Sequence, residues 1–100
     1  MEVVVKTFKE LSIEELYEIY YWRTAIFVVE QNCPYQDIDE YDKKAYHVYL
    51  KDEQGIQAYL RVIEPGAKFA EASLGRVISR RRRQGLGLRL VLKGIEVAQK

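Results

Sequence analysis

The stretch SRRRRQGLG (residues 79–87) decides how this chain is expected to fold, because it places four arginines and two glycines between two regular segments. The preceding residues, 72–79, read ASLGRVIS and predict a strand. The following residues, 86–99, carry apolar side chains at helical spacing and predict a helix with a broad buried face. The first turn of a helix presents unpaired N–H groups and a partial positive charge, and glycine lets a ligand approach the backbone closely. The junction therefore predicts a site for an anion such as a phosphate group.

Two common phosphate motifs do not fit this junction. The P-loop pattern G-x-x-x-x-G-K-[ST] is absent. The dinucleotide pattern G-x-G-x-x-G is absent as well, because Gly85-Leu86-Gly87 is followed by Leu88-Arg89-Leu90. A solvated, arginine-rich turn that caps a helix remains open as the plainer interpretation.

The remaining pattern predicts one domain, residues 1–100, with the order β–α–loop–β–β–β–α. Ser12 stands three residues before Glu15, which is a capping-box pattern and predicts a helix start. Gln31-Asn32-Cys33-Pro34 predicts the end of that helix, because proline disfavours helical dihedral angles in the residue before it. The expected strands are 3–8, 46–51, 56–63 and 72–79, the expected helices are 13–29 and 86–99, and a polar, acidic loop is expected over 34–45. We expect an α/β (α+β) fold, with a mixed, mainly antiparallel sheet flanked by helices.

Composition is typical of a folded soluble protein. Hydrophobic residues make up 48% of the 100 residues and charged residues 31%, and no apolar run is long enough to span a membrane. The N-terminus lacks the basic region of a signal peptide, and the single cysteine, Cys33, cannot form an internal disulfide. We therefore expect a cytoplasmic location and no membrane partner.

Charge is unevenly distributed, although the formal net charge is only +1. Residues 1–50 have five Lys or Arg against ten Asp or Glu, whereas residues 51–100 have eleven against five. This asymmetry favours a local anion site over a uniformly basic surface. Nucleic-acid binding through Arg80–Arg83 is the least favoured function, because no aromatic residues are interleaved with that run.

Two segments resemble a known family. Arg82, Gly85 and Gly87 match the pattern [Q/R]-x-x-G-x-[G/A], which resembles the acyl-CoA motif of the GNAT N-acetyltransferase superfamily in the same strand–loop–helix setting. Residues 23–39, RTAIFVVEQNCPYQDID, are similar to a long segment of the ElaA-like subgroup, and Gly75-Arg76-Val77-Ile78 fits that subgroup too. The likeness spans most of residues 12–95, and the long segment is far more specific than the glycine motif.

This resemblance implies the acyl-CoA N-acyltransferase fold and an N-acetyltransferase that transfers an acetyl group from acetyl-CoA to an amine, with no metal. In such enzymes the strand before the motif pairs its backbone with the pantetheine arm, and the amides of the motif bind the pyrophosphate. The implied positions are Val77, Ile78 and Ser79 for the arm, and Arg82, Arg83, Gln84, Gly85, Leu86 and Gly87 for the motif. The family continues with further strands and another helix, which implies a domain incomplete at its C-terminus. A truncated or degenerate CoA-binding module without turnover is the alternative function.

Few other side chains suggest catalysis. Glu30 lies in the ElaA-like segment and is a candidate to contact the acceptor amine, although a surface or loop-anchoring carboxylate is at least an equal alternative. His47, the only histidine, is expected to be a packed or surface residue rather than a base. No cluster has the spacing of metal ligands.

The acceptor side is less defined. Tyr35 and Tyr41 are candidates to line an acceptor groove, and Arg76 is expected to pair with a carboxylate. A small-molecule or peptide amine remains open as acceptor, and the broad apolar face of the last helix makes a homodimer a candidate assembly. The acidic positions either attract a cationic acceptor or are simply solvated; they are Asp37, Asp39, Glu40 and Asp42.

Overall fold

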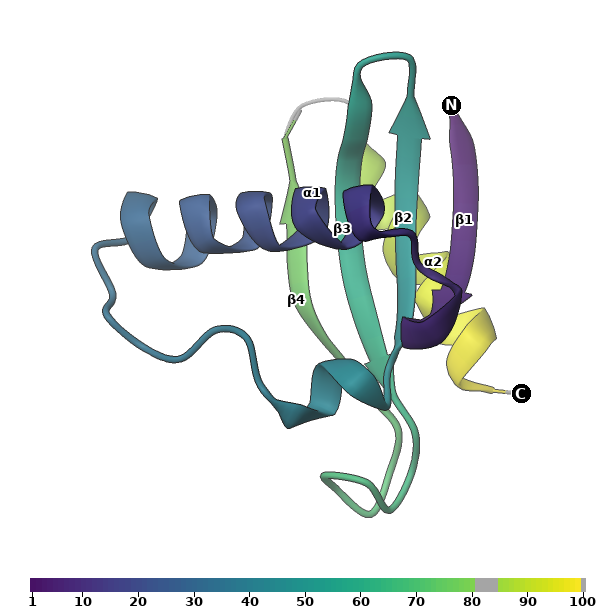
Figure 1. The fold of residues 1–100 in the computed structure, drawn as a ribbon. Coiled ribbons are helices and arrows are strands. Elements are labelled where there is room, and N and C mark those ends of the chain that lie inside the picture. The colour runs from purple at the N-terminus through teal and green to yellow at the C-terminus, as the bar shows by residue number, and fades with distance from the viewer. Residues whose placement is uncertain (81–84, 100) are drawn as a thin grey trace.

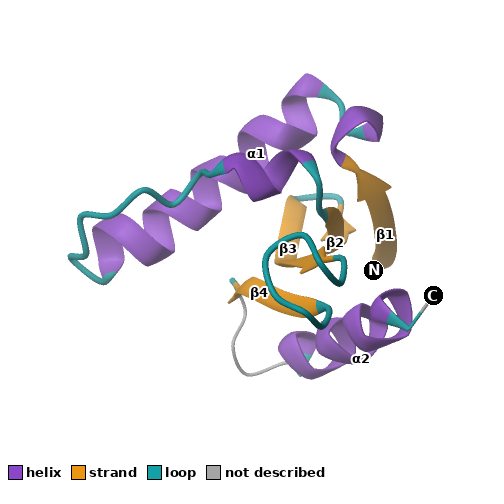
Figure 2. Ribbon diagram, turned by 90° about the horizontal axis from the view of Figure 1, so that it is seen from below, coloured by secondary structure: helices purple, strands orange, loops and turns teal. Residues whose placement is uncertain are grey.

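A four-stranded antiparallel sheet lies between two helices in the computed structural model, which describes residues 1–80 and 85–99. Its strands follow one another in sequence order, and α1 crosses one face while α2 lies against the other (Figures 1 and 2). The elements are β1 (Glu2–Thr7), η1 (Phe8–Glu10), α1 (Ile13–Thr24), η2 (Ala25–Glu30), η3 (Glu40–Lys43), β2 (Tyr46–Asp52), β3 (Gly55–Ile63), β4 (Ser73–Ser79) and α2 (Leu86–Ala98). The expected order and the mainly antiparallel sheet are confirmed.

The first helix begins where the capping box predicts. Ser12 Oγ accepts a hydrogen bond from the Glu15 N–H (3.0 Å), and Glu15 Oε1 accepts one from the Ser12 N–H (2.8 Å). The helix continues as the π-helical segment η2, so the single α-helix expected over 13–29 changes its winding after Thr24. The last turn is closed by the Cys33 N–H, which donates to the Val28 carbonyl (3.0 Å), and the helix ends before Pro34. π-Helical turns are rare and often lie near functional sites.

The sheet buries both of its faces, so the core is divided into two layers. One layer packs under α1, where Ile19 meets Tyr49, Tyr59 and Ile78. The other layer packs against α2 and contains Val48, Leu50, Ala58, Leu60, Val62, Leu86 and Leu90. Residues 48–50 of β2 and 58–60 of β3 alternate between the two layers, as the period of a strand requires, whereas a register shift after Leu50 places Ile56 in the α1 layer.

Strand β4 interrupts this alternation with a bulge. Gly75 pairs with Arg61 and Ile78 pairs with Tyr59, so two β4 residues, Arg76 and Val77, stand opposite one residue of β3. Leu74 packs against the α2 layer, whereas Ile78 belongs to the α1 layer. Residues four apart in a regular strand share a face. The extra residue therefore places Leu74 and Ile78 on opposite faces of the sheet.

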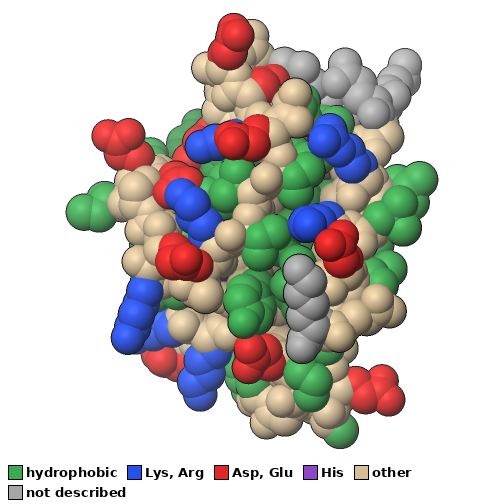
Figure 3. Space-filling model, turned by 90° about the vertical axis from the view of Figure 1, so that its right-hand side faces the viewer, with side chains coloured by type: hydrophobic (Ala, Val, Ile, Leu, Met, Phe, Trp, Pro, Cys, Tyr) green, Lys and Arg blue, Asp and Glu red, His purple; other side chains and the backbone are tan. Residues whose placement is uncertain are grey.

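The surface retains apolar side chains. Leu88, Leu92 and Ile95 of α2 are 68%, 59% and 42% exposed. The side of the molecule drawn in Figure 3 likewise shows hydrophobic side chains between scattered charges of both signs. None of the described helices is long and apolar enough to cross a membrane.

Candidate functional site

A groove lies between the end of the first helix and the outer strand of the described sheet. Ile26, Phe27 and Gln31 form one wall, and β4 residues 77–79 form the other, around a volume of about 340 Å³. The three β4 positions that were expected to meet the pantetheine arm, Val77, Ile78 and Ser79, thus line one groove. Ile26, Phe27 and Gln31 were missed as site residues, although they fall within the ElaA-like segment.

The outer edge of β4 pairs with no other strand among the described residues. The Arg80 N–H donates to the Gln57 carbonyl of β3 (2.8 Å), and the next pair along the ladder is Ala58 with Ser79. Backbone groups alternate in direction along a strand, so those of Ser79 point away from β3 toward the open edge. An extended ligand can add hydrogen bonds at such an edge.

The start of α2 is open as well. Gly85 takes left-handed dihedral angles (φ 68°, ψ 13°), and no side chain caps the helix among the described residues. A Cβ at Gly85 or at Gly87 would meet no atom of the described residues within 4 Å, so this part of the chain leaves free space in front of both. Leu86 is buried in the α2 layer and offers a ligand only its backbone. In Figure 1, β4 and α2 are joined by the grey trace; the expected contacts Arg82, Arg83 and Gln84 lie outside the described residues.

The acidic loop has a different role from either expectation. Its aspartates are neither solvated nor free for a cationic acceptor, because each binds arginines of the same chain. Exposed Glu40 pairs with Lys43, at 3.7 Å. We call the following set the Asp–Arg network: Arg23, Asp37, Asp39, Asp42, Arg61 and Arg76.

Arg23 is the centre of the Asp–Arg network and is fully buried. Its Nε donates to Asp37 Oδ2 (3.0 Å), its Nη1 to Asp42 Oδ1 (2.6 Å) and its Nη2 to the Asp37 carbonyl (2.8 Å). The role of Arg23 was missed from the sequence. Its position in the sequence could have indicated this role. Arg23 stands four residues after Ile19 on the buried face of α1, where an arginine requires acidic partners.

Arg61 completes the Asp–Arg network from β3 and was also missed. Its Nη1 donates to Asp39 Oδ1 (2.7 Å) and to Asp42 Oδ1 (3.0 Å). Partial burial alone would raise the pKa of Asp39, but the hydrogen bonds and charge of Arg61 outweigh burial and lower it. The expected pairing of Arg76 with a carboxylate is confirmed, since its Nε lies 2.9 Å from Asp37 Oδ1.

His47 is a packed residue, as expected. Its Nε2 lies 2.9 Å from the Asp42 carbonyl, which can only accept, so Nε2 carries the proton. Its Nδ1 then accepts from the hydroxyl of Tyr59 at 2.7 Å. Burial lowers the pKa of His47 and favours this neutral form.

The other candidates are not among the residues that line this groove. Glu30 is exposed at the end of η2 and is not one of the lining residues, so its contact with an acceptor stays a prediction. Tyr35 and Tyr41 do not line the groove either: the Tyr35 hydroxyl donates to Asp37 Oδ1 (3.0 Å), and Lys68 Nζ lies over the Tyr41 ring (5.1 Å). Arg80 is held to the protein, with its guanidinium over the Trp22 ring at 3.9 Å.

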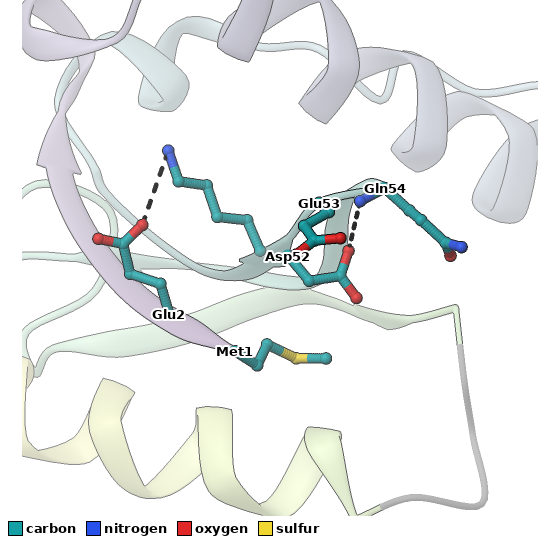
Figure 4. A pocket seen from close by; sticks show the side chains of 6 residues that line it. Met1, Glu2, Asp52, Glu53 and Gln54 are labelled. Carbon is teal, nitrogen blue, oxygen red and sulfur yellow. Dashed lines mark hydrogen bonds and ion pairs between the residues drawn. The ribbon is translucent and has the colours of Figure 1, made fainter.

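Two other hollows contain none of the predicted site residues. One of about 590 Å³ lies at the β2–β3 turn, where Met1, Glu2, Asp52, Glu53 and Gln54 surround it (Figure 4). The other, of about 800 Å³, lies between the C-terminal half of α2 and the sheet. Across residues 1–80 and 85–99, no group of His, Cys, Asp or Glu side chains could hold a metal ion.

Comparison with known proteins identifies relatives over almost the whole chain, although no family model matches. The chain is 38% identical to a UPF0039 protein of Schizosaccharomyces pombe over 102 residues, covering 99% of this chain and 67% of that protein. It is 37% identical to the protein ElaA of Escherichia coli over 91 residues, covering 87% of this chain and 60% of that protein.

Comparison with solved structures points to the same group of proteins. The crystal structure of an acyl-CoA N-acyltransferase from Pseudomonas aeruginosa superposes with a TM-score of 0.91 at 33% identity, covering 99% of this chain and 69% of that one. The crystal structure of Escherichia coli ElaA superposes with a TM-score of 0.90 at 34% identity, covering 98% and 69%. The chain therefore spans between 60% and 69% of the length of these relatives.

Proposed function

The chain belongs to the ElaA-like family of the GNAT superfamily, with the acyl-CoA N-acyltransferase fold, and on this premise we propose that it binds an acyl-CoA and transfers the acyl group to an amine. Acetyl-CoA is the expected acyl donor. The observation that carries the proposal is the groove itself: Val77, Ile78 and Ser79 line it at an open sheet edge, and β4 leads from there toward the uncapped start of α2.

The residues present fit such a ligand. The outward-facing backbone of Ser79 would hydrogen-bond the pantetheine arm, and the amides at Gly85–Gly87 would bind phosphate oxygens, because first-turn amides of a helix are unpaired. The space in front of both glycines is what a closely approaching pyrophosphate requires. Ile26 and Phe27 would exclude water from the reacting end of the ligand. Bound acyl-CoA would supply the activated thioester.

A second candidate is CoA binding without turnover. The groove is lined by Ile26, Phe27, Gln31, Val77, Ile78 and Ser79. None of these side chains has a pKa suited to accept the proton of an attacking amine. This favours a role for the described groove in binding and orientation, with proton transfer assigned to groups elsewhere in an active protein.

Thermal unfolding with increasing acetyl-CoA tests the proposal. A ligand that binds only the folded state adds about 2.7 kcal/mol of stability at a concentration 100 times its dissociation constant. We expect a concentration-dependent rise in melting temperature, followed by CoA release when an amine panel is added. A rise without CoA release would support the second candidate, and no rise at millimolar acetyl-CoA would contradict both.

A matched pair of variants locates the binding site. Gly87→Ala places a methyl group in the free space at the α2 start and should reduce the acetyl-CoA-induced rise. Leu92→Ala removes a side chain that is 59% exposed on the same helix and should leave the rise unchanged. Equal behaviour of the two variants would place the phosphate contacts elsewhere.

A further inference from the structure

Arg76 holds an unusual backbone conformation at the centre of β4. Its φ is 54°, and among the described residues the only other non-glycine with positive φ is Asn32. Asparagine tolerates this region, whereas arginine rarely adopts it. Such a residue persists when its surroundings hold it in place, and such positions cluster at functional sites.

The side chain of Arg76 provides that hold. Its Nη2 donates to the Asp37 carbonyl (3.1 Å) and lies 3.4 Å from Asp39 Oδ2. Its guanidinium lies 5.6 Å from the centre of the Tyr35 ring, whose hydroxyl is bonded to Asp37. Residue 76 is therefore fixed to the loop around residues 35–39, far from it in sequence.

These contacts are not needed to neutralise the loop. Arg23 already binds Asp37 from within the core, and Arg61 already binds Asp39. The Arg76 side chain is 21% exposed, whereas that of Arg23 is 0% exposed. Loss of Arg76 would thus leave no buried carboxylate without an arginine, and its contribution to global stability should be small.

The β4 bulge shapes one wall of the groove. It moves Ile78 onto the α1 side of the sheet, although Leu74 lies on the α2 side. A regular strand would exchange the faces of residues 77–79, because a shift of one residue reverses every side chain. The groove wall of Val77–Ser79 therefore depends on the conformation at residue 76.

We propose that Arg76 is a positioning residue: its guanidinium, held by Asp37 and Asp39, maintains the β4 bulge and thereby the acyl-CoA wall of the groove. This inference rests on the proposed function for its ligand. It connects the acidic loop to the cofactor groove through one side chain and assigns that loop a role other than attracting the acceptor.

The test compares Arg76→Ala with Arg89→Ala. The control removes the same charge from an exposed position on α2, where the Arg89 guanidinium makes a long contact with the Met1 carbonyl (3.4 Å). We expect Arg76→Ala to weaken acetyl-CoA binding about tenfold, the factor that corresponds to a loss of 1.4 kcal/mol. Its melting temperature without ligand should stay close to that of the wild type. Arg89→Ala should bind normally.

Two further variants separate the side chain from the backbone. Glycine adopts positive φ without strain, so Arg76→Gly can keep the bulge but loses the guanidinium contacts with Asp37 and Asp39. Adding a small guanidinium compound at millimolar concentration should restore acetyl-CoA binding to Arg76→Gly and have no effect on Arg89→Ala. Arg76→Lys retains the charge and stem but not the planar fork, and it should bind more weakly than the wild type.

Amide hydrogen exchange gives a reading that does not depend on the ligand. Exchange at Val77–Ser79 should increase in Arg76→Ala and remain unchanged in Arg89→Ala. If the wild type binds no acetyl-CoA, the proposed function fails while this comparison still tests the hold on the bulge. Unchanged exchange at residues 77–79, or a uniform increase over the whole sheet with loss of melting temperature, would overturn the positioning role.

Discussion

The Asp–Arg network and the start of α2 are both rich in charge or hydrogen-bonding groups, yet the protein treats them in opposite ways. In the network, Arg23 and Asp42 are fully buried and bind each other at 2.6 Å. At the start of α2, Gly85 and Gly87 face free space and no side chain caps the helix among the described residues. Charge in a sequence thus does not by itself mark a ligand site. The proposed ligand site is distinguished instead by hydrogen-bonding groups that no described side chain caps.

The Asp–Arg network fixes how the acidic loop lies against the sheet. The Asp–Arg network carries three aspartates and three arginines, so its formal charges cancel. Buried ion pairs contribute less to stability than their contacts suggest, because removing both charges from water is costly. Their better-supported effect is to fix one arrangement of the chain. Here that arrangement brings the loop that follows η2 against β3 and β4.

The largest effect is expected from opening the closed region. Arg23→Met should lower the free energy of unfolding by about 3–5 kcal/mol, because it leaves Asp37 and Asp42 buried without their central partner. Urea denaturation followed by circular dichroism measures the change. The control Lys43→Met removes an ion pair whose side chains are 64% and 84% exposed and should change stability by less than about 0.5 kcal/mol. Equal losses of stability in the two variants would show that Arg23 contributes no more than an exposed ion pair.

A smaller loss is expected from a tightly packed point within α2. Gly94→Ala would place a Cβ only 2.7 Å from Leu74 Cδ2 and 3.1 Å from the methyl groups of Leu60. Overpacking of this kind costs about 1–3 kcal/mol, which exceeds the roughly 1 kcal/mol that alanine gains over glycine in a helix. A lowered thermal denaturation midpoint is the expected result. A raised midpoint would show that α2 can move away from the sheet.

The pH dependence of stability tests whether His47 is buried in its neutral form. Burial lowers its folded-state pKa below the ordinary 6.5, so the unfolded chain binds a proton first as pH falls. The stability that neutral His47 contributes is therefore present above pH 6.5 and is lost as pH decreases toward the folded pKa. The free energy of unfolding should fall by up to about 1.4 kcal/mol per pH unit below that value. His47→Gln, which keeps a donor and an acceptor but does not titrate, should abolish this slope.

Local patterns predicted the elements well. The capping box at Ser12, the break at Pro34, the hairpin of β2 and β3, and the helix after Gly85 all lie where the sequence indicated. Each depends on residues within a few positions of one another. The open start of α2 belongs to the same class, because glycine and helical periodicity are visible without tertiary contacts.

The bulge and the Asp–Arg network could not be predicted in this way. Arg61 and Arg76 reach Asp39 across 22 and 37 residues, and nothing local reveals such pairs. The strand at Ala72–Ser79 was recognised, but its bulge depends on Leu74 and Ile78 being required on opposite faces. From the sequence alone, the aspartates of the acidic loop looked unpaired, because their arginine partners lie on α1, β3 and β4.

The smallest effect on stability, and the most direct test of the contrast, comes from Gly87→Ala. The added Cβ meets no atom of the described residues within 4 Å and the position is already helical, so the free energy of unfolding should rise by up to about 1 kcal/mol. The same substitution at Gly94 has the opposite expected sign, although both glycines belong to one helix. If Gly87→Ala is stabilising without ligand and yet binds acetyl-CoA less well, the loss must come from the ligand side of the helix start, because the protein itself offers no clash. A destabilised Gly87→Ala would show instead that the start of α2 is closed by its own chain.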